Sequence, residues 1–220
     1  MEHYFYISLI LLAAAAIGFF IGAPKYLRPH RPLYASMIVL GVGCIMIGKV
    51  YTFLRILTGL PVFGVFHVGI LGTVGAFAFF FSANYGQIDS LVDSGDKEFM
   101  KYRIIAIAGI LITGILYTFI LLSPATAAEK FKTGIATLSI AAASYFHVKH
   151  ILIPDIDYGV VSCQRGYNII ALIYGISCML EMTATSYSSD ILLFISCALQ
   201  CAASAILVPV MDKGVQKWSK

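Results

Sequence analysis

Long apolar stretches alternate with short polar connections along the whole chain. A helix needs roughly 20 apolar residues to cross a hydrocarbon core about 30 Å thick. The connections are too short to form a separate soluble domain, so the pattern predicts an all-α membrane protein with one seven-helix transmembrane domain over residues 1–220. The seven predicted spans are 5–23, 34–55, 62–83, 103–122, 131–151, 160–187 and 190–210.

The overall composition supports the membrane interpretation. Hydrophobic residues make up 60% of the chain and charged residues 12%, whereas soluble domains average about 45–50% and about 25%. A water-soluble globule of this size could not bury so much apolar surface. The composition excludes a soluble enzyme, a disordered chain and a nucleic-acid-binding module. Membrane lipids are therefore expected as partners, and nucleic acid is not.

Lysines and arginines are distributed unevenly between the two sides of the predicted bundle. Because basic residues favour cytoplasmic loops, an excess of eleven over three predicts an outside N-terminus and a cytoplasmic C-terminus in the cell membrane. The basic cluster also follows the first apolar stretch, which favours an uncleaved anchor over a secretory signal. The larger set is Lys25, Arg28, Arg31, Lys97, Lys101, Arg103, Lys149, Arg165, Lys213, Lys217 and Lys220, and the smaller set is Arg55, Lys130 and Lys132.

A short motif occurs twice in the chain. Residues 43–53 and 109–119 both follow the pattern Gly-x4-Gly-x2-Tyr-Thr-Phe, at an offset of 66. The pattern favours diverged hairpin repeats made of helices 2–3, 4–5 and 6–7, as in many transporters. The alternative is that small residues and interfacial aromatics recur through composition alone.

Three ionisable residues fall at a similar depth within predicted spans. Lys49 lies 15 residues past Tyr34, which is about 22 Å of helical rise, and therefore in the outer half of the bilayer. Glu181 in the sixth span and His67 in the third reach a similar depth. Intramembrane charges are costly unless they are paired or face a cavity. We therefore expect a Lys49–Glu181 ion pair with His67 nearby.

Further polar side chains accompany this pair. They predict a polar pocket that binds a small polar or charged ligand, with transport or translocation of that ligand as the favoured function. The alternative is an interhelical salt bridge that only fixes the packing. The predicted ligand-binding residues are Lys49, His67, Tyr117, Tyr174, Ser177, Glu181, Ser196 and Gln200.

A second cluster of polar residues follows the fifth span. His147 and His150 share a helix face, and Asp155 and Asp157 follow them closely. Histidine and carboxylate ligands suit zinc or iron, so a membrane-embedded, metal-dependent hydrolase acting on lipid is an alternative function. Interfacial residues beside lipid headgroups explain the same pattern. A ligand-binding receptor or sensor subunit is a third possibility, and the sequence leaves open a homo-oligomer or a partner subunit.

Overall fold

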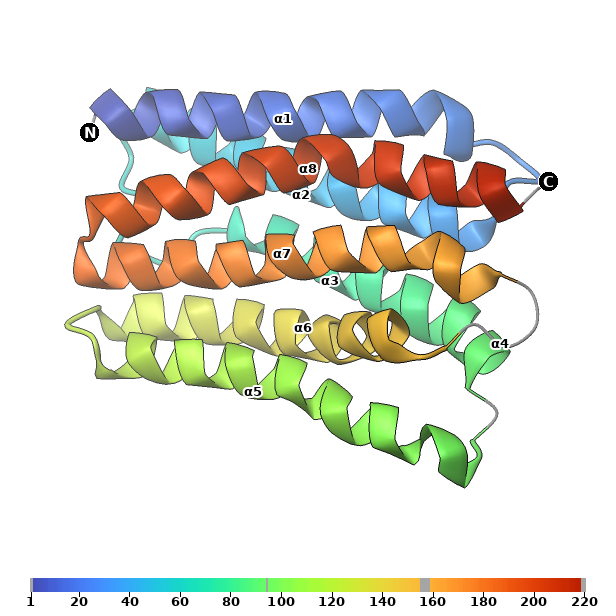
Figure 1. Cartoon of the computed structure of the whole chain (residues 1–220). Helices are drawn as coiled ribbons and strands as arrows, with labels where there is room; N and C mark the ends of the chain where they lie inside the picture. Colours follow the sequence, from blue (N-terminus) through green and yellow to red (C-terminus); the bar gives the residue numbers. More distant parts are fainter. Residues whose placement is uncertain (1, 94, 155–158, 219–220) are drawn as a thin grey trace.

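The computed structural model describes residues 2–93, 95–154 and 159–218. Every regular element in these ranges is helical (Figure 1). The long helices run side by side, with the N-terminus at one end of the bundle and the C-terminus at the other. The elements are α1 (Glu2–Tyr26), α2 (Leu33–Leu57), α3 (Ile70–Ala83), a π-helix (Asn84–Asp89), α4 (Ser90–Val92), a 3-10 helix (Lys97–Phe99), α5 (Met100–Leu122), α6 (Ala127–Leu152), α7 (Val160–Tyr187) and α8 (Asp190–Trp218).

Neighbouring helices in the chain pack as hairpins. α2 lies along α3, α5 along α6, and α7 along α8, while α1 contacts both α2 and α8. α3 and α7 also contact α6, so the α5–α6 hairpin is joined to the rest of the bundle. This arrangement places α1, α2, α3, α6 and α7 around one interior region.

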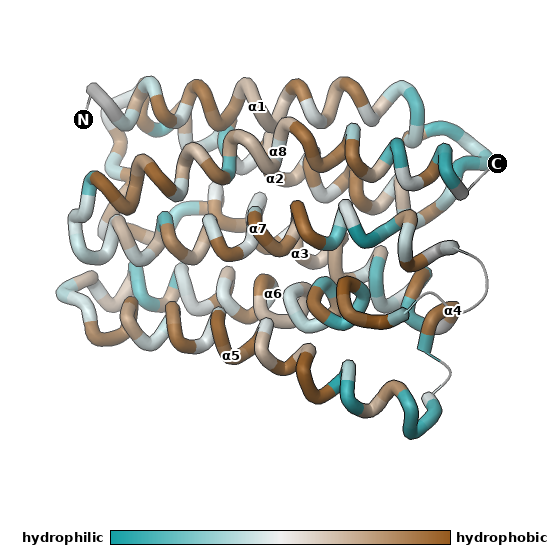
Figure 2. Tube along the Cα trace, viewed as in Figure 1, coloured by the Kyte–Doolittle hydropathy of each residue, from teal (hydrophilic) through white to brown (hydrophobic). Residues whose placement is uncertain are grey.

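The outer surface of the bundle is strongly apolar. Hydrophobic residues follow the helices in Figure 2, and large side chains such as Leu122 and Ile191 are 75% and 77% exposed. Water would oppose so much exposed apolar surface. Among the described residues, five helices are long and apolar enough to cross a membrane, as expected of an α-helical membrane protein. They cover Tyr4–Tyr26, Leu33–Leu57, Lys97–Leu122, Val161–Tyr187 and Asp190–Lys217.

The predicted third helix is wrong at its start. The sequence predicts a span over 62–83, but α3 begins only at Ile70, and residues 58–69 form an irregular connection that we call the 58–69 segment. Gly59 and Gly64 take φ values of +69° and +71°, which are left-handed conformations that other residues rarely adopt. Pro61, which lacks a backbone N–H, lies between them. These residues prevent the helix from extending across the whole predicted stretch.

Side chains from two helices hold the 58–69 segment in place. The Arg55 guanidinium donates to the Pro61 carbonyl through Nη2 (2.6 Å) and Nε (3.0 Å). The Thr126 hydroxyl donates to the Gly64 carbonyl at 2.9 Å, and the Gly64 N–H donates to Glu129 Oε2 at 3.1 Å. Irregular backbone at membrane depth is tolerated where protein or a polar cavity satisfies it. The segment is therefore a part of the fold that is fixed by specific hydrogen bonds.

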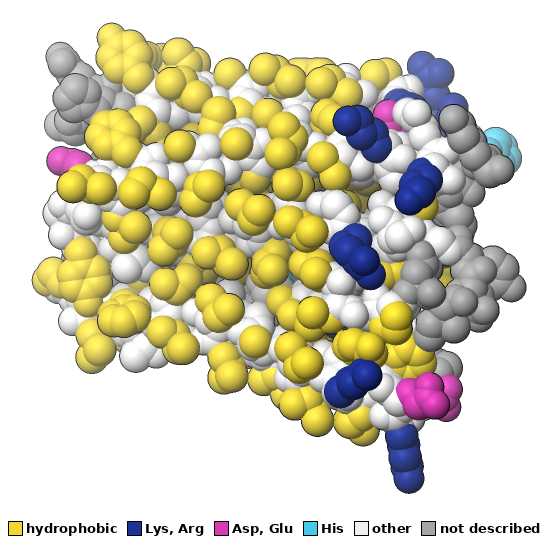
Figure 3. Space-filling model, in the orientation of Figure 1, with side chains coloured by type: hydrophobic (Ala, Val, Ile, Leu, Met, Phe, Trp, Pro, Cys, Tyr) yellow, Lys and Arg dark blue, Asp and Glu magenta, His cyan; other side chains and the backbone are white. Residues whose placement is uncertain are grey.

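Basic side chains gather at the end of the bundle where the C-terminus lies (Figure 3), and we call this the basic end. α1, the π-helix and α6 all finish there, while α2, α5 and α7 begin there. The opposite end, where α1 begins, is the N-terminal end. The uneven charge distribution predicted from the sequence therefore has a counterpart in the three-dimensional arrangement.

The two copies of the repeated motif pack differently. A Cβ placed on Gly48 would lie 2.7 Å from the Gly69 carbonyl oxygen, because α2 and α3 cross there in backbone contact. A Cβ placed on Gly114 would have no heavy atom of the described chain within 4 Å, apart from its own helix. Thr52 and Thr118 do match, since each hydroxyl donates to the carbonyl four residues earlier. The hairpin repeat stays a prediction.

Candidate functional site: a charged pocket beside the start of α3

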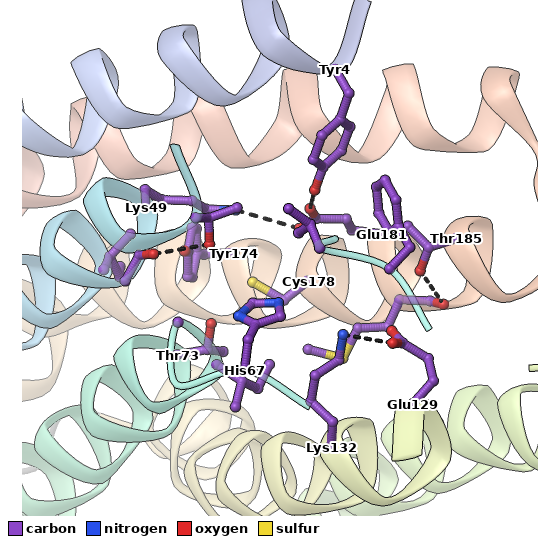
Figure 4. A pocket seen from close by; sticks show the side chains of 18 residues that line it. Tyr4, Lys49, His67, Thr73, Glu129, Lys132, Tyr174, Cys178, Glu181 and Thr185 are labelled. Carbon is purple, nitrogen blue, oxygen red and sulfur yellow. Dashed lines mark hydrogen bonds and ion pairs between the residues drawn. The ribbon is translucent and has the colours of Figure 1, made fainter. Parts of the chain in front are cut away.

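A cavity of about 80 Å³ lies inside the N-terminal half of the bundle (Figure 4). Its walls come from α1, α2, α3, α6, α7 and the 58–69 segment. One water needs roughly 10–15 Å³ of such volume, so the cavity has room for about five to eight water-sized groups. The polar residues that line it are Tyr4, Lys49, Thr52, His67, Thr73, Glu129, Lys132, Tyr174, Cys178, Glu181 and Thr185.

The predicted Lys49–Glu181 ion pair forms one wall of this pocket. Lys49 Nζ lies 3.5 Å from Glu181 Oε2, and each side chain is 16% exposed. Gln200 bridges the pair, since its Oε1 accepts from Lys49 at 3.1 Å and its Nε2 donates to Glu181 Oε2 at 2.7 Å. The Tyr4 hydroxyl donates to Glu181 Oε1 at 3.3 Å. The glutamate therefore has three partners from α1, α2 and α8.

A second ion pair lies across the pocket at the start of α6. Lys132 Nζ is 2.7 Å from Glu129 Oε2, and both side chains are 7% exposed. The local sequence explains the placement, because Thr126 caps α6 by accepting the Glu129 N–H at 3.2 Å. In a capping box the glutamate three residues after the cap turns back to the cap's own N–H. Here Glu129 accepts the N–H of Gly64 instead.

His67 lies in the pocket between the two ion pairs (Figure 4). Its imidazole stacks on Tyr51 with ring centroids 6.2 Å apart. The residue is only 8% exposed, and its Nδ1 has no hydrogen-bond partner among the described residues. A Cβ on Gly69 would lie 2.9 Å from this nitrogen. The glycine therefore leaves room beside the ring.

The structure brings together most of the predicted site residues. Lys49, His67, Tyr174 and Glu181 line the pocket, and Gln200 bonds to both members of the first ion pair. These side chains come from α2, the 58–69 segment, α7 and α8, so residues far apart in the sequence converge on one region.

Three predicted residues lie elsewhere. The hydroxyls of Ser177 and Ser196 donate to the carbonyls of Tyr174 and Leu193 on their own helices. Tyr117 Oη donates to the Lys130 carbonyl, where α5 meets α6. Each hydroxyl thus has a local backbone acceptor, and none of the three residues is among those that line the cavity.

Seven polar residues that line the pocket are not among the predicted ligand-binding residues: Tyr4, Thr52, Thr73, Glu129, Lys132, Cys178 and Thr185. In the sequence, Lys132 counts only as one of three basic residues on the outer side, and Glu129 precedes the predicted 131–151 span. The Thr126-x-x-Glu129 capping pattern could have placed both on the first turns of a helix. No sequence signal indicated Tyr4, because its position depends on how α1 packs against α2 and α8.

The second predicted cluster lies in a polar network at the basic end. His147 Nδ1 lies 2.8 Å from Asn168 Oδ1 and 3.0 Å from Asn84 Nδ2, and Asn84 Oδ1 lies 3.1 Å from His150 Nδ1. His150 Nε2 lies 3.0 Å from Asp89 Oδ1. The π-helix supplies both Asn84 and Asp89. We call this set, together with Lys149, Asp93 and Arg103, the basic-end network.

Ion pairs complete the basic-end network. Lys149 Nζ lies 2.6 Å from an oxygen of Asp89 and 2.6 Å from an oxygen of Asp93. The Arg103 Nε donates to Asp93 Oδ2 at 2.8 Å. Arg103 therefore lowers the pKa of the Asp93 carboxyl, and although burial opposes this, Lys149 and the Gly95 N–H lower it further, to well below its usual range.

The metal-site hypothesis stays a prediction. Asp155 and Asp157 lie outside the described residues. Within the described parts of the chain, no group of three or more His, Cys, Asp or Glu side chains is arranged to hold a metal ion. The His150 nitrogens and the Asp89 carboxylate contact one another, Asn84 and Lys149 instead.

Comparison with protein-family models, with curated protein sequences and with solved structures finds no match for this chain. Functional conclusions therefore rest on the geometry of the pocket.

Proposed function

We propose that the chain is a seven-span membrane protein that binds a small polar or charged ligand in the charged pocket and translocates it. The observation that carries this proposal is the cavity itself, with the Lys49–Glu181 and Glu129–Lys132 pairs in its walls. Charged groups inside a bundle are expensive, and in membrane proteins they mark substrate and ion pathways.

The seven-span topology is supported by the arrangement of the elements. The 58–69 segment, α3 and the π-helix together extend between the same two ends as the longer helices, and α6 does so alone. Basic residues gather at the end where the C-terminus lies. The positive-inside rule then favours a cytoplasmic basic end and an outside N-terminus. In that orientation the pocket lies in the outer half of the bilayer.

The discontinuous third span favours transport over structural packing alone. In many transporters, substrate sites are formed where a helix is interrupted and its backbone lines a cavity. Here Gly69 and Ile70, at the start of α3, both line the pocket. A bound ligand would compete for the partners of Lys49 and Glu181, which join α1, α2, α7 and α8. Differential contact of this kind is what shifts a conformational equilibrium.

Uptake into proteoliposomes tests the proposal. Four radiolabelled probes represent the four charge classes of small ligand: glycine, acetate, methylammonium and glycerol. We expect protein-dependent uptake of at least one of them, abolished by Lys49→Met and by Glu181→Gln. Lys97→Met and Glu98→Gln are matched controls, because both residues are exposed in the connection before α5 and should leave uptake unchanged.

The outcomes separate the alternatives. Saturable binding without uptake would favour a receptor or sensor subunit. Stoichiometric zinc or iron in the purified protein, with lipid turnover, would favour the hydrolase. If wild-type protein takes up none of the four probes, or if both pocket variants transport normally, the proposal is overturned and the ion pairs are structural.

A further inference from the structure

Resting on the proposed function, we propose that the pocket takes a small zwitterion, in which a carboxylate and an ammonium group lie a few bonds apart. The carboxylate contacts Lys132 and the start of α3, and the ammonium contacts Glu181. Four properties of the pocket lead to this assignment: its charge balance, its unused hydrogen-bonding capacity, the unpartnered nitrogen of His67, and its size.

The charges in the pocket already balance. Its described lining residues include two lysines and two glutamates, arranged as the Lys49–Glu181 and Glu129–Lys132 pairs. His67 adds no charge as a neutral imidazole. A ligand with a net charge would leave that charge uncompensated in a buried site, which is strongly unfavourable. A zwitterion brings two charges with a sum of zero, so both ends find a partner and the balance is kept.

Donor capacity is concentrated on one side of the pocket. An ammonium group has three N–H donors, and for Lys132 the described residues provide one carboxylate oxygen, Glu129 Oε2. The start of α3 lies on the same cavity, since Gly69 and Ile70 line it. The N–H groups of residues 70–72 donate to the carbonyls of residues 67–69, so the helix contributes its dipole here and not free donors. A helix N-terminus carries the positive end of the helix dipole and favours an anionic group. This side of the pocket therefore suits a carboxylate.

His67 supplies the independent sign that a ligand belongs here. His67 lines the pocket, the residue is more than nine-tenths buried, and its Nδ1, which faces Gly69, has no hydrogen-bond partner among the described residues. Buried polar atoms in native proteins are almost always hydrogen-bonded. A small turn of the ring would let this nitrogen donate to or accept from a polar ligand in the cavity, according to its tautomer.

Glu181 provides acceptor capacity on the opposite wall. Glu181 Oε1 accepts one hydrogen bond, from Tyr4, and a carboxylate oxygen has room for a second. The cavity of about 80 Å³ takes a molecule of about five to eight non-hydrogen atoms at roughly one water volume per atom. The smallest α-amino acids have this size and carry both charged groups.

A set of four isosteric probes tests the charge class directly. L-Alanine is the zwitterion, L-lactate the anion, L-alaninamide the cation and L-lactamide the uncharged member, and all four have the same number of non-hydrogen atoms. Binding is measured by calorimetry on the full chain in lipid nanodiscs. We expect L-alanine to bind at least about tenfold more tightly than each of the others, since each lacks a charged partner for one buried group. Glycine with glycolate, glycinamide and glycolamide repeats the test on a smaller frame.

Two variants assign the ends of the ligand. Glu181→Gln should remove the preference for alanine over lactate, because it removes the partner of the ammonium. The double variant Glu129→Gln/Lys132→Met keeps the pocket neutral and should remove the preference for alanine over alaninamide. A variant that does not give a monodisperse protein is replaced by Glu181→Asp or Lys132→Arg, which keeps the charge and should keep the preference.

The results distinguish this inference from the proposed function. If lactate, alaninamide or lactamide binds as tightly as alanine and Lys49→Met abolishes that binding, the zwitterion assignment is overturned while a ligand pocket stands. If no member of the alanine or glycine series binds while acetate, methylammonium or glycerol is taken up, the zwitterion assignment fails and the transport proposal stands. If no member of either series binds and no probe is taken up, the zwitterion assignment and the transport proposal both fail.

Discussion

The charged pocket and the basic-end network use the same kinds of residue in opposite ways. Each contains lysine, carboxylate, histidine and amide side chains, and each adjoins one end of α3. In the pocket, Lys49 and Glu181 are 3.5 Å apart beside a cavity. At the basic end, Lys149 lies 2.6 Å from oxygens of both Asp89 and Asp93. The pocket leaves hydrogen-bond donors and acceptors unused around a cavity. At the basic end, the same kinds of group bond to one another.

The difference follows from the backbone on either side of α3. Towards the pocket, the chain is irregular over the 58–69 segment, and Gly69 and Ile70 at the helix start line the cavity. Towards the basic end, the helix continues as a π-helix that directs Asn84 and Asp89 onto α6. Isolated π turns occur frequently at functional sites, but here the turn joins helices. The lesson is that residue type alone does not separate a binding site from a structural junction.

The largest expected effect is on stability at the basic end. Lys149→Met removes the shared partner of Asp89 and Asp93, and breaking a buried ion pair costs about 3–5 kcal/mol. Lys49→Met should cost less, because Lys49 Nζ lies 3.5 Å from one carboxylate, whereas Lys149 Nζ lies 2.6 Å from each of two. Thermal unfolding of the purified variants in detergent measures both. A larger loss for Lys49→Met would reverse the comparison.

Acid should weaken the same junction. Because the pKa of Asp93 is lowered in the folded protein, its stabilising effect is present above the unfolded value of about 3.9 and is lost as pH falls further. At neutral pH, Asp93→Asn should therefore lower the free energy of unfolding by about 1.5–3 kcal/mol. Melting wild type and variant between pH 7 and acid should show the gap narrowing below about pH 4. A gap that widens in acid would contradict the assignment.

The crossing of α2 and α3 forms the wall of the pocket, and it should tolerate no side chain. A Cβ on Gly48 would lie 2.7 Å from the backbone oxygen of Gly69, so Gly48→Ala should destabilise the protein by about 1–3 kcal/mol. Gly114→Ala is the matched control in the second copy of the motif, where it should be neutral or stabilise by up to about 1 kcal/mol. Equal melting temperatures for the two variants would show that the crossing is not tight.

The smallest expected effect concerns the 58–69 segment. Thr126→Ala removes the cap of α6 and the hydrogen bond to the Gly64 carbonyl, which together should cost about 1 kcal/mol. Amide hydrogen exchange over residues 58–69 should become faster. Thr118→Ala is the control, because the exposed Thr118 hydroxyl donates only to its own helix, at Gly114. Unchanged exchange in the Thr126 variant would mean that Arg55 and Glu129 suffice to hold the segment.

Much of the helical framework could be predicted from the sequence, because long apolar runs have few other stable conformations in lipid. The error in the third span has a local cause: residues 62–69 are apolar enough for a helix, but Gly64 takes a left-handed conformation. Hydropathy does not detect this, because glycine counts as neither polar nor charged.

The candidate site was predictable only in part. Intramembrane charge led to Lys49 and Glu181, since so few charged residues lie within the apolar stretches. Lys132 and Glu129 were not predicted as site residues, because they lie near the end of a predicted span, where charged residues are common. Their burial arises from the way the 58–69 segment covers the start of α6. Such a contact joins residues about 65 positions apart and leaves no local pattern.

The shortness of α3 has a mechanical consequence. Its 14 residues make a rod about 21 Å long, shorter than a hydrocarbon core of about 30 Å. The rod abuts the charged pocket with one end and the basic-end network with the other, and it packs against α2 through backbone contact at Gly48 and Gly72 and through Phe80 on Gly41. A displacement of the rod along its axis would alter both ends at once, so the charged pocket and the basic-end network are mechanically coupled through α3.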